Sequence, residues 1–165
     1  LVSHMAGRYR DTSGNLRAVT QAMIEHPDFA AAAARRDKFR TPYRFVVALL
    51  RASGRNPVAS APLAGALRQL GQPQYGCVQP NGWACTAAEW LSPDALSARI
   101  NVAVALGAGA LRIDPAAPRD DPVPVRVVAE ALGDRLDATA LQAARDVPPR
   151  LASALLLGSP AMHYC

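Results

Sequence analysis

The cysteines are the most distinctive reactive groups of this sequence. Cys77 and Cys85 are separated by seven residues in a segment rich in glycine and proline, and Cys165 ends the chain. In an exported protein, a disulfide between Cys77 and Cys85 would close a short loop and stabilise the fold by roughly 2 to 3 kcal/mol. In a cytosolic protein, two such residues are more commonly free thiols. The spacing alone leaves both states open.

A zinc site is a weaker interpretation of the same residues. Cys77, Cys85, His163 and Cys165 supply four soft ligands, but structural zinc motifs generally pair cysteines two to four residues apart. Because seven residues separate the first pair, the sequence predicts no metal ligand and no cofactor.

Basic residues gather in one stretch of the chain. Five cations fall within ten residues, opposed only by Asp37, and two further arginines continue the series at near-helical spacing: Arg35, Arg36, Lys38, Arg40 and Arg44, then Arg51 and Arg55. A solvated helix face is one interpretation. The functional one is a docking surface for an acidic partner, with Arg36, Arg40, Arg44 and Arg51 as candidates. A net charge of +5 is modest and no aromatic platform accompanies the stretch, so nucleic acid is not favoured.

Two aromatic residues lie in the same irregular segment as the cysteine pair. Tyr75 and Trp83, with Gly76 and Gly82 beside them, could form an aromatic lip that binds carbohydrate or peptide. Aromatic residues of loops also commonly pack back onto the core. Trp90, which follows the segment, is predicted to be a core residue.

The sequence contains no recognisable catalytic motif. It lacks the nucleophile elbow of hydrolases, the paired-histidine helix of zinc proteases and the glycine-rich phosphate or dinucleotide loops. His26 and His163 have no nucleophile or orienting carboxylate at a defining spacing, and Asp94 suits a helix cap. No catalytic residue is predicted.

The composition indicates a helical globule. The chain has 165 residues, 14 prolines and only 5% aromatic residues, which favours short helices punctuated by proline and nearly excludes an all-β fold. One compact domain is expected. The longest apolar run, residues 101–111, is far shorter than the roughly 18 to 20 residues that cross a bilayer, so no membrane span is predicted.

Periodicity and capping residues predict an all-α domain of seven to eight short helices. They are expected near residues 15–25, 27–36, 41–53, 61–70, 92–107, 125–136, 137–145 and 148–158, with a short turn at 86–90. The apolar positions expected in the longest helix are Leu96, Ile100, Ala103, Val104 and Leu106. Residues 71–86 form a long irregular loop, and 111–124 a proline-rich connector. Residues 1–5 are interpreted as the remnant of an expression tag, 6–162 as the helical module and 163–165 as a tail.

Three ordered motifs carry a family resemblance. They lie at residues 38–54, at 70–96 with Gly82-Trp83 inside, and at 154–160. Together they resemble the C-terminal third of a bacterial family known as domain of unknown function 1800. Two positions depart from its pattern: Cys85 stands where relatives tend to have an acidic residue, and Met162 where they have an aromatic one.

The resemblance implies a longer parent protein that is usually exported, hence a periplasmic or secreted location, and it names no activity. Two hypotheses follow. In the first, the chain is a non-catalytic packing or interaction module that contacts the N-terminal part of its parent or an acidic partner protein. In the second, it supplies the substrate-facing loop of an enzyme whose catalytic residues lie in that N-terminal part.

Overall fold

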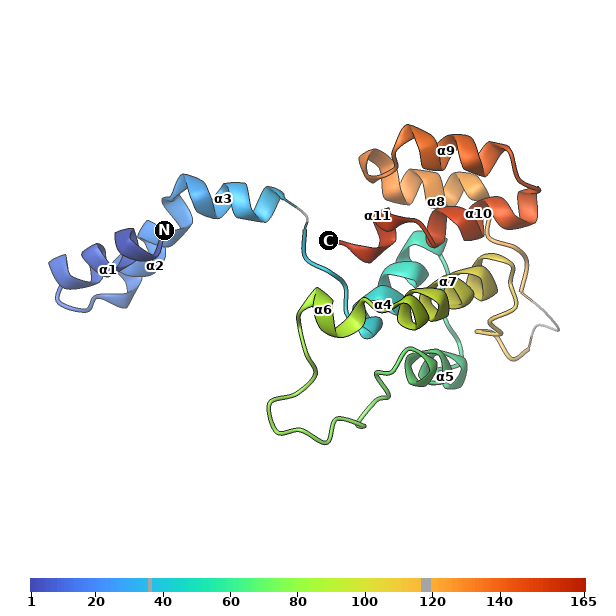
Figure 1. Ribbon diagram of the computed structural model, residues 1–165, viewed down its shortest axis with the longest axis horizontal. Coiled ribbons are helices and arrows are strands. Elements are labelled where there is room, and N and C mark those ends of the chain that lie inside the picture. Colours follow the sequence, from blue (N-terminus) through green and yellow to red (C-terminus); the bar gives the residue numbers. More distant parts are fainter. Residues whose placement is uncertain (36, 117–119) are drawn as a thin grey trace. The chain divides into compact units, whose positions relative to one another are not determined.

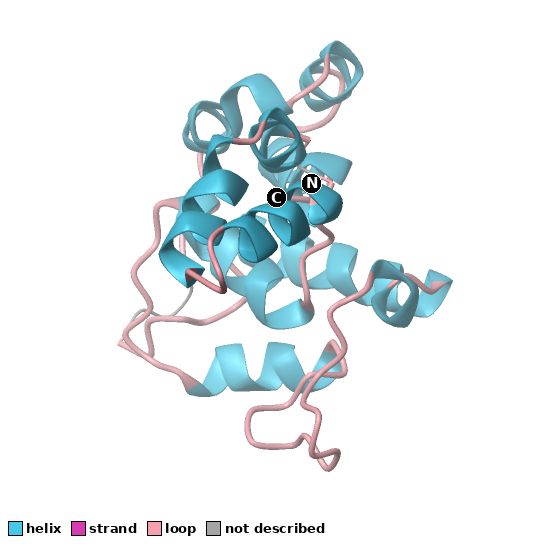
Figure 2. Cartoon of the chain, turned by 90° about the vertical axis from the view of Figure 1, so that its left-hand side faces the viewer, coloured by secondary structure: helices cyan, strands magenta, loops and turns pink. Residues whose placement is uncertain are grey.

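The structure is a computed structural model that describes residues 1–35, 37–116 and 120–165 (Figure 1). These residues form helices and loops with no strand (Figure 2), which confirms the predicted all-α fold. The helices are α1 (Val2–Asp11), α2 (Leu16–Glu25), α3 (Pro27–Ala34), α4 (Pro42–Ser53), α5 (Ala61–Gln69), α6 (Ala87–Trp90), α7 (Pro93–Gly107), α8 (Val125–Leu132), the 3-10 turn η1 (Gly133–Arg135), α9 (Ala138–Arg145), α10 (Pro149–Leu157) and α11 (Pro160–His163). Residues 71–86 contain no helix, as predicted.

Local capping chemistry explains many of the helix boundaries. The side chains of Asn15, Ser92 and Asp137 accept hydrogen bonds from backbone N–H groups three residues later, at 3.2, 3.1 and 2.6 Å. Each bond satisfies a donor that the first turn of a helix leaves unpaired. At the other end of α4, Gly54 adopts a left-handed conformation with φ of 66°, which glycine does without steric cost.

Three elements differ from the sequence-based expectations. Helix α1 includes the residues that were interpreted as a tag remnant, and α11 adds a short turn after residue 158. The helix expected over 125–136 is divided at Gly133, whose positive φ of 50° ends α8 and begins η1. None of the side chains of α1 is buried, so no apolar periodicity could reveal that helix.

The chain forms two compact units, Leu1–Asp37 and Lys38–Cys165. In the first, α1 packs against α2 and α2 against α3, with Ala22 buried between them. In the second, α4 contacts α5, α7 and α8, while α10 contacts α7, α8 and α9. This larger unit contains the hydrophobic core, which is built around Phe45, Leu49, Leu106 and Leu157.

Helix α7 crosses α10 closely because a glycine lies at the contact. A Cβ atom added to Gly107 would lie 2.9 Å from the Cα of Ala154, which is closer than any side chain tolerates. The buried face of α7 comprises Val102, Ala103 and Leu106, but also Arg99. By contrast, three of the apolar positions expected from the sequence, Leu96, Ile100 and Val104, are more than one third exposed.

The proline-rich connector is fixed to the helices through Asp120. Its carboxylate lies 3.2 Å from the guanidinium of Arg55 and accepts a hydrogen bond from the N–H of Ile113 at 3.3 Å. Arg55 also donates to the carbonyl of Asp121. Arg55 therefore holds the connector in place, although the sequence grouped it with an exposed basic series.

The last three residues of the chain pair with residues 38–40. Phe39 and Tyr164 form an antiparallel bridge. The N–H of Arg40 donates to the carbonyl of His163 at 2.8 Å, and the N–H of Cys165 donates to that of Lys38 at 2.9 Å. These bonds attach the segment predicted as a tail to the start of the larger unit.

Candidate functional site

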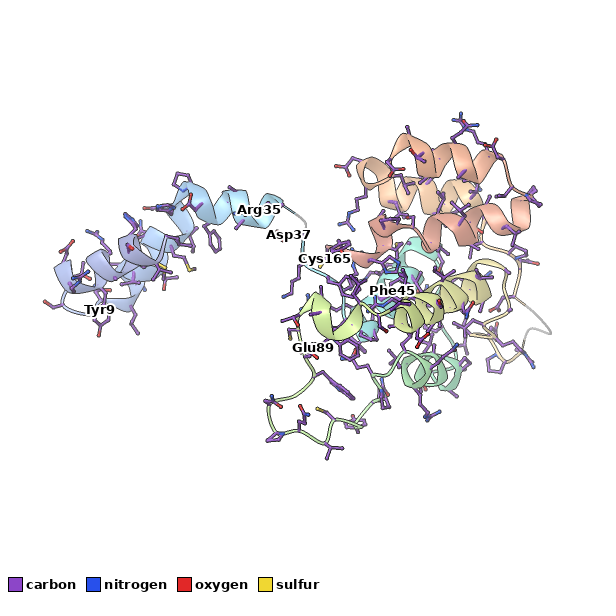
Figure 3. All side chains as sticks on the ribbon, viewed as in Figure 1. Tyr9, Arg35, Asp37, Phe45, Glu89 and Cys165 are labelled. Carbon is purple, nitrogen blue, oxygen red and sulfur yellow. The ribbon has the colours of Figure 1, made fainter. Side chains whose placement is uncertain are left out.

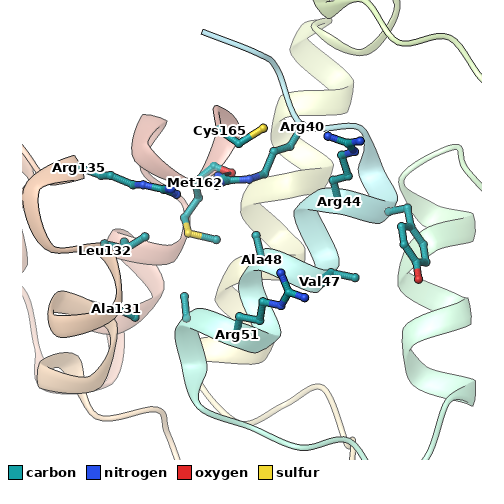
Figure 4. Close-up of a pocket in the computed structure, with 12 residues that line it drawn as sticks. Arg40, Arg44, Val47, Ala48, Arg51, Ala131, Leu132, Arg135, Met162 and Cys165 are labelled. Carbon is teal, nitrogen blue, oxygen red and sulfur yellow. Dashed lines mark hydrogen bonds between the residues drawn. The ribbon is translucent and has the colours of Figure 1, made fainter. Parts of the chain in front are cut away.

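Arginine side chains surround one groove in the larger unit. The groove has a volume of about 510 Å³ and is lined by Arg40, Tyr43, Arg44, Val47, Ala48, Arg51, Ala52, Ala131, Leu132, Arg135, Met162 and Cys165 (Figure 4). Four of these side chains are cationic and none is acidic. The arrangement can therefore attract an anionic ligand.

One wall of the groove is a single face of α4. Val47 and Ala48 each lie three or four residues from both Arg44 and Arg51, which places all four on the same side of a helix. The opposite face of α4 carries buried residues such as Phe45. The packing of that apolar face fixes which way the two arginines point.

The other wall comes from residues far along the chain. Ala131 and Leu132 belong to α8, Arg135 to η1, and Met162 and Cys165 to the C-terminal segment. In Figure 4, Arg135 and Arg40 extend toward Met162 from opposite sides. The groove thus exists only when α4, α8 and the end of the chain are packed together.

The structure brings together three of the four predicted docking residues. Arg40, Arg44 and Arg51 line the groove, whereas Arg36 lies outside the described residues. Arg44 and Arg51 are exposed, as is Arg135. Among the residues that the structure describes, none of these three side chains has a hydrogen-bond or ion-pair partner. Their guanidinium groups can therefore bind a ligand without breaking an internal contact.

Arg40 has a different role from the other three. It is only 7% exposed, and it donates to the carbonyls of Met162 at 2.8 Å and Ala161 at 3.3 Å. Burial lowers the pKa of its guanidinium, while the nearby Cys165 opposes that shift. Arg40 therefore holds the C-terminal segment against the groove.

A buried aromatic and basic cluster lies behind Arg40. The guanidinium of Arg99 lies 4.5 Å from the ring centre of Phe39 and 5.0 Å from that of Phe45, and it donates to the carbonyl of Arg40 at 2.8 Å. Arg99 is 1% exposed, and burial lowers its pKa to about 10. Two cation–π contacts and one hydrogen bond stabilise this charge, and no carboxylate of the described residues pairs with it.

His163 completes the cluster as a neutral ring. It stacks on Phe45 with a centroid distance of 5.2 Å and is 5% exposed. Burial, followed by the positive charge of Arg99, lowers the pKa of His163 to about 4. At neutral pH the ring therefore acts as an aromatic core residue.

The predicted loop residues do not form one lip. Tyr75 is fully exposed with a positive φ of 56°, whereas Trp83 is half-buried and lines a separate cavity with Cys77. Trp90 is also half-buried and lies outside the core cluster, which corrects its predicted core position. The structure contains Cys77, Cys85 and Cys165 as free cysteines, so it does not show the candidate disulfide between Cys77 and Cys85.

Sequence reasoning missed Arg135, Arg99 and His163. No local pattern could assign Arg135 to the groove, because its neighbours there lie on α4 and at the chain end. Arg99 did leave a signal, since it precedes Val102, Ala103 and Leu106 by three, four and seven residues and so lies on the face they bury.

Across the described ranges, no three histidine, cysteine or acidic side chains gather as a metal site. Within those same ranges, no helix combines the length and apolar character needed to cross a membrane.

The chain was compared with protein families, curated proteins and solved structures. No curated protein and no solved structure matches it significantly. Residues 1–164 match the family described as protein of unknown function, DUF1800. Since the match covers essentially the whole chain, the protein belongs to the DUF1800 family.

Proposed function

We propose that the unit Lys38–Cys165 is a non-catalytic interaction module whose arginine groove binds an acidic segment of a partner protein. The observation that carries this proposal is the lining of the groove, which contains four guanidinium side chains and no aspartate or glutamate side chain. Arg44, Arg51 and Arg135 are exposed at its surface. Arginine is well suited to such a role because its planar group binds carboxylates in a bidentate manner.

The apolar part of the groove supports a peptide rather than a small inorganic anion as the ligand. Between the arginines lie Val47, Ala48, Leu132 and Met162, which can contact the aliphatic part of glutamate or neighbouring side chains. A volume of about 510 Å³ falls within the range of small-ligand sites. An acidic segment that also carries apolar residues would use both kinds of contact.

The cellular setting of the module is part of this proposal. The family motifs resemble those of longer exported bacterial proteins, which supports a periplasmic or secreted location. The acidic partner would then be another part of such a parent protein or a separate exported protein. The charge of the groove supports either partner equally.

A second candidate function is a substrate-facing loop in an enzyme assembled with another polypeptide segment. The cavity beside Trp83 favours it, since Trp83 is half-buried on a loop and loops carry a large share of binding residues. Within the described residues, however, this cavity has a single acidic lining side chain, Glu89, and we assign it no catalytic step.

To test the proposed function, a fluorescent peptide of alternating glutamate and leucine is titrated with the full chain. Its fluorescence anisotropy measures the affinity at a series of increasing salt concentrations. The variant R44Q/R51Q/R135Q removes the exposed groove arginines. A matched control, R68Q/R112Q/R126Q, removes the same charge from exposed positions outside the groove lining.

We expect the groove variant to bind at least about tenfold more weakly, because each charged contact contributes on the order of 1 kcal/mol. The control should bind within about twofold of the wild type. An equal loss of peptide affinity in both variants would show that binding depends only on the net charge of the protein, and it would refute the proposal. Absence of binding by the wild type at low salt would also refute the proposal.

A further inference from the structure

A second cavity lies where the irregular loop meets α6. It has a volume of about 390 Å³ and is lined by Gly71, Gly76, Cys77, Val78, Gln79, Gly82, Trp83, Ala84, Glu89 and Trp90. Glu89 belongs to α6, close to the point where the loop projects from the helices (Figure 3). The residues that line this cavity fall within one stretch of 20 residues, 71–90.

Both tryptophans of the chain line this cavity. Their ring centroids are 6.1 Å apart and the ring planes are inclined by 52°, so the two indoles form a corner. The N–H of Trp90 donates to the carbonyl of Ala84 at 2.8 Å, which fixes one ring against the loop. The two indoles therefore supply a preformed aromatic corner of the cavity.

The charge of the cavity is negative although the protein is basic. Glu89 is the one charged side chain of its lining, in a chain of net charge +5. Within the described part of the chain, Glu89 forms no ion pair. A carboxylate that lines the same cavity as two indoles and forms no such ion pair is available to a positively charged ligand.

We infer that this cavity binds an organic cation, such as a quaternary ammonium group or the charged end of a basic side chain. The faces of tryptophan rings attract cations more strongly than those of other aromatic residues, and Glu89 adds direct charge complementarity. The inference rests on this cavity alone and does not depend on the proposed function of the arginine groove.

The lining favours a cation over a sugar or a metal ion. A sugar requires several hydrogen-bonding groups around its ring, yet the N–H of Trp90 is already engaged and the polar side chains here are few: Gln79, Glu89 and the thiol of Cys77. A hard metal ion requires several oxygen ligands, and the cavity supplies one carboxylate. Neither alternative uses the inclined indole pair.

The experiment is a titration of the full chain with choline chloride, followed by intrinsic tryptophan fluorescence. Because both tryptophans line the cavity, the signal reports on this site directly. 3,3-Dimethyl-1-butanol, which has the shape of choline without its charge, measures the apolar contribution. Methyl glucoside tests the sugar alternative, and sodium chloride at equal ionic strength controls for screening.

Glu89→Gln keeps the size of the side chain and removes its charge, and Glu130→Gln is the matched control at an exposed glutamate outside the cavity lining. We expect choline to bind in the millimolar range and Glu89→Gln to weaken it about fivefold, which corresponds to about 1 kcal/mol. Glu130→Gln should leave the affinity unchanged.

The neutral analogue should bind at least about fivefold more weakly than choline. Equal affinity for both compounds would show an apolar pocket without charge recognition and would overturn the inference. So would preferential binding of methyl glucoside, or a fluorescence that choline leaves unchanged. Binding to the acidic peptide in the same samples, measured by anisotropy, tests the arginine groove separately.

Discussion

The arginine groove and the tryptophan cavity are opposite in charge and in construction. The groove takes its side chains from residues 40–52, 131–135 and 162–165, whereas the cavity uses the stretch 71–90. One is positive and the other negative. A groove assembled from distant segments depends on the whole packed unit, while a cavity within one loop depends mainly on local contacts. The two sites should therefore respond differently to changes in the core.

Loss of the buried guanidinium should produce the largest difference between the two sites. Arg99→Ala removes the hydrogen bond to the Arg40 carbonyl and both cation–π contacts, and leaves an empty space between Phe39 and Phe45. We expect the free energy of unfolding to fall by about 4 kcal/mol, measured by urea denaturation. Under conditions where the variant stays folded, acidic-peptide binding should weaken more than choline binding.

Arg68→Ala is the control for that variant, because Arg68 is exposed on α5 and lines neither site. Its stability should stay within about 0.5 kcal/mol of the wild type. A stability of Arg99→Ala as high as that of the control would contradict the structural role of the buried cluster.

Low pH should destabilise the same cluster by protonating His163. Its pKa is lowered to about 4 in the folded state against about 6.5 when unfolded, so the unfolded chain binds the proton more readily. Stability is therefore retained above about pH 6.5 and falls by about 3 kcal/mol as the pH decreases toward 4. Urea denaturation at a series of pH values measures this loss.

His163→Phe should remove most of the pH dependence in that interval, because the ring stack with Phe45 is kept and the titrating group is lost. His26→Phe serves as the control, since His26 belongs to the smaller unit. An unchanged pH profile in His163→Phe would show that other groups cause the acid sensitivity.

Single substitutions at the groove rim should have smaller effects that are confined to binding. Arg51→Gln and Arg135→Gln should each lower the affinity for the acidic peptide about fivefold, which corresponds to about 1 kcal/mol. Both variants should bind choline as the wild type does. Neither side chain has a partner among the described residues, so stability should change by less than about 0.5 kcal/mol. If either variant also bound choline more weakly, the proposal that the two sites act independently would be wrong.

The smallest effect is expected from the loop cysteines. Because Cys77 and Cys85 are free cysteines in the structure, Cys77→Ser/Cys85→Ser should change stability by less than about 0.5 kcal/mol. Both thiols of the wild type should react with a labelling reagent before any reduction. A mass lower by two hydrogens in oxidised protein, with labelling at position 165 alone, would instead establish the disulfide.

The sequence predicted the features that depend on neighbouring residues. The helix starts expected near residues 15, 92 and 137, the helix end expected near residue 53 and the irregular segment 71–86 all follow from local chemistry. The basic series that contains Arg44 and Arg51 was recognised for the same reason, because its near-helical spacing is visible in the sequence, whereas the groove was not predicted.

The remaining features depend on packing between distant segments. Arg135 reaches the groove only because α8 packs on α4, and no spacing in the sequence encodes that contact. In α7, apolar residues occur on more than one side of the helix, so Leu96 and Ile100 were predicted to be buried. The face that is buried is instead the one that includes Arg99. Arginine is rarely buried without an acidic partner, so the sequence pattern predicts an exposed position for it.

The pairing of residues 38–40 with 163–165 has a mechanical consequence. Both ends of the larger unit meet at one antiparallel bridge, so a few backbone hydrogen bonds hold Lys38 beside Cys165. Tension between these ends would open these hydrogen bonds one after another, beginning at Cys165, before it reached the helices. Cys165 would then be the first residue to leave the groove wall, so tension on this unit would act on the arginine groove before it reached the helical core.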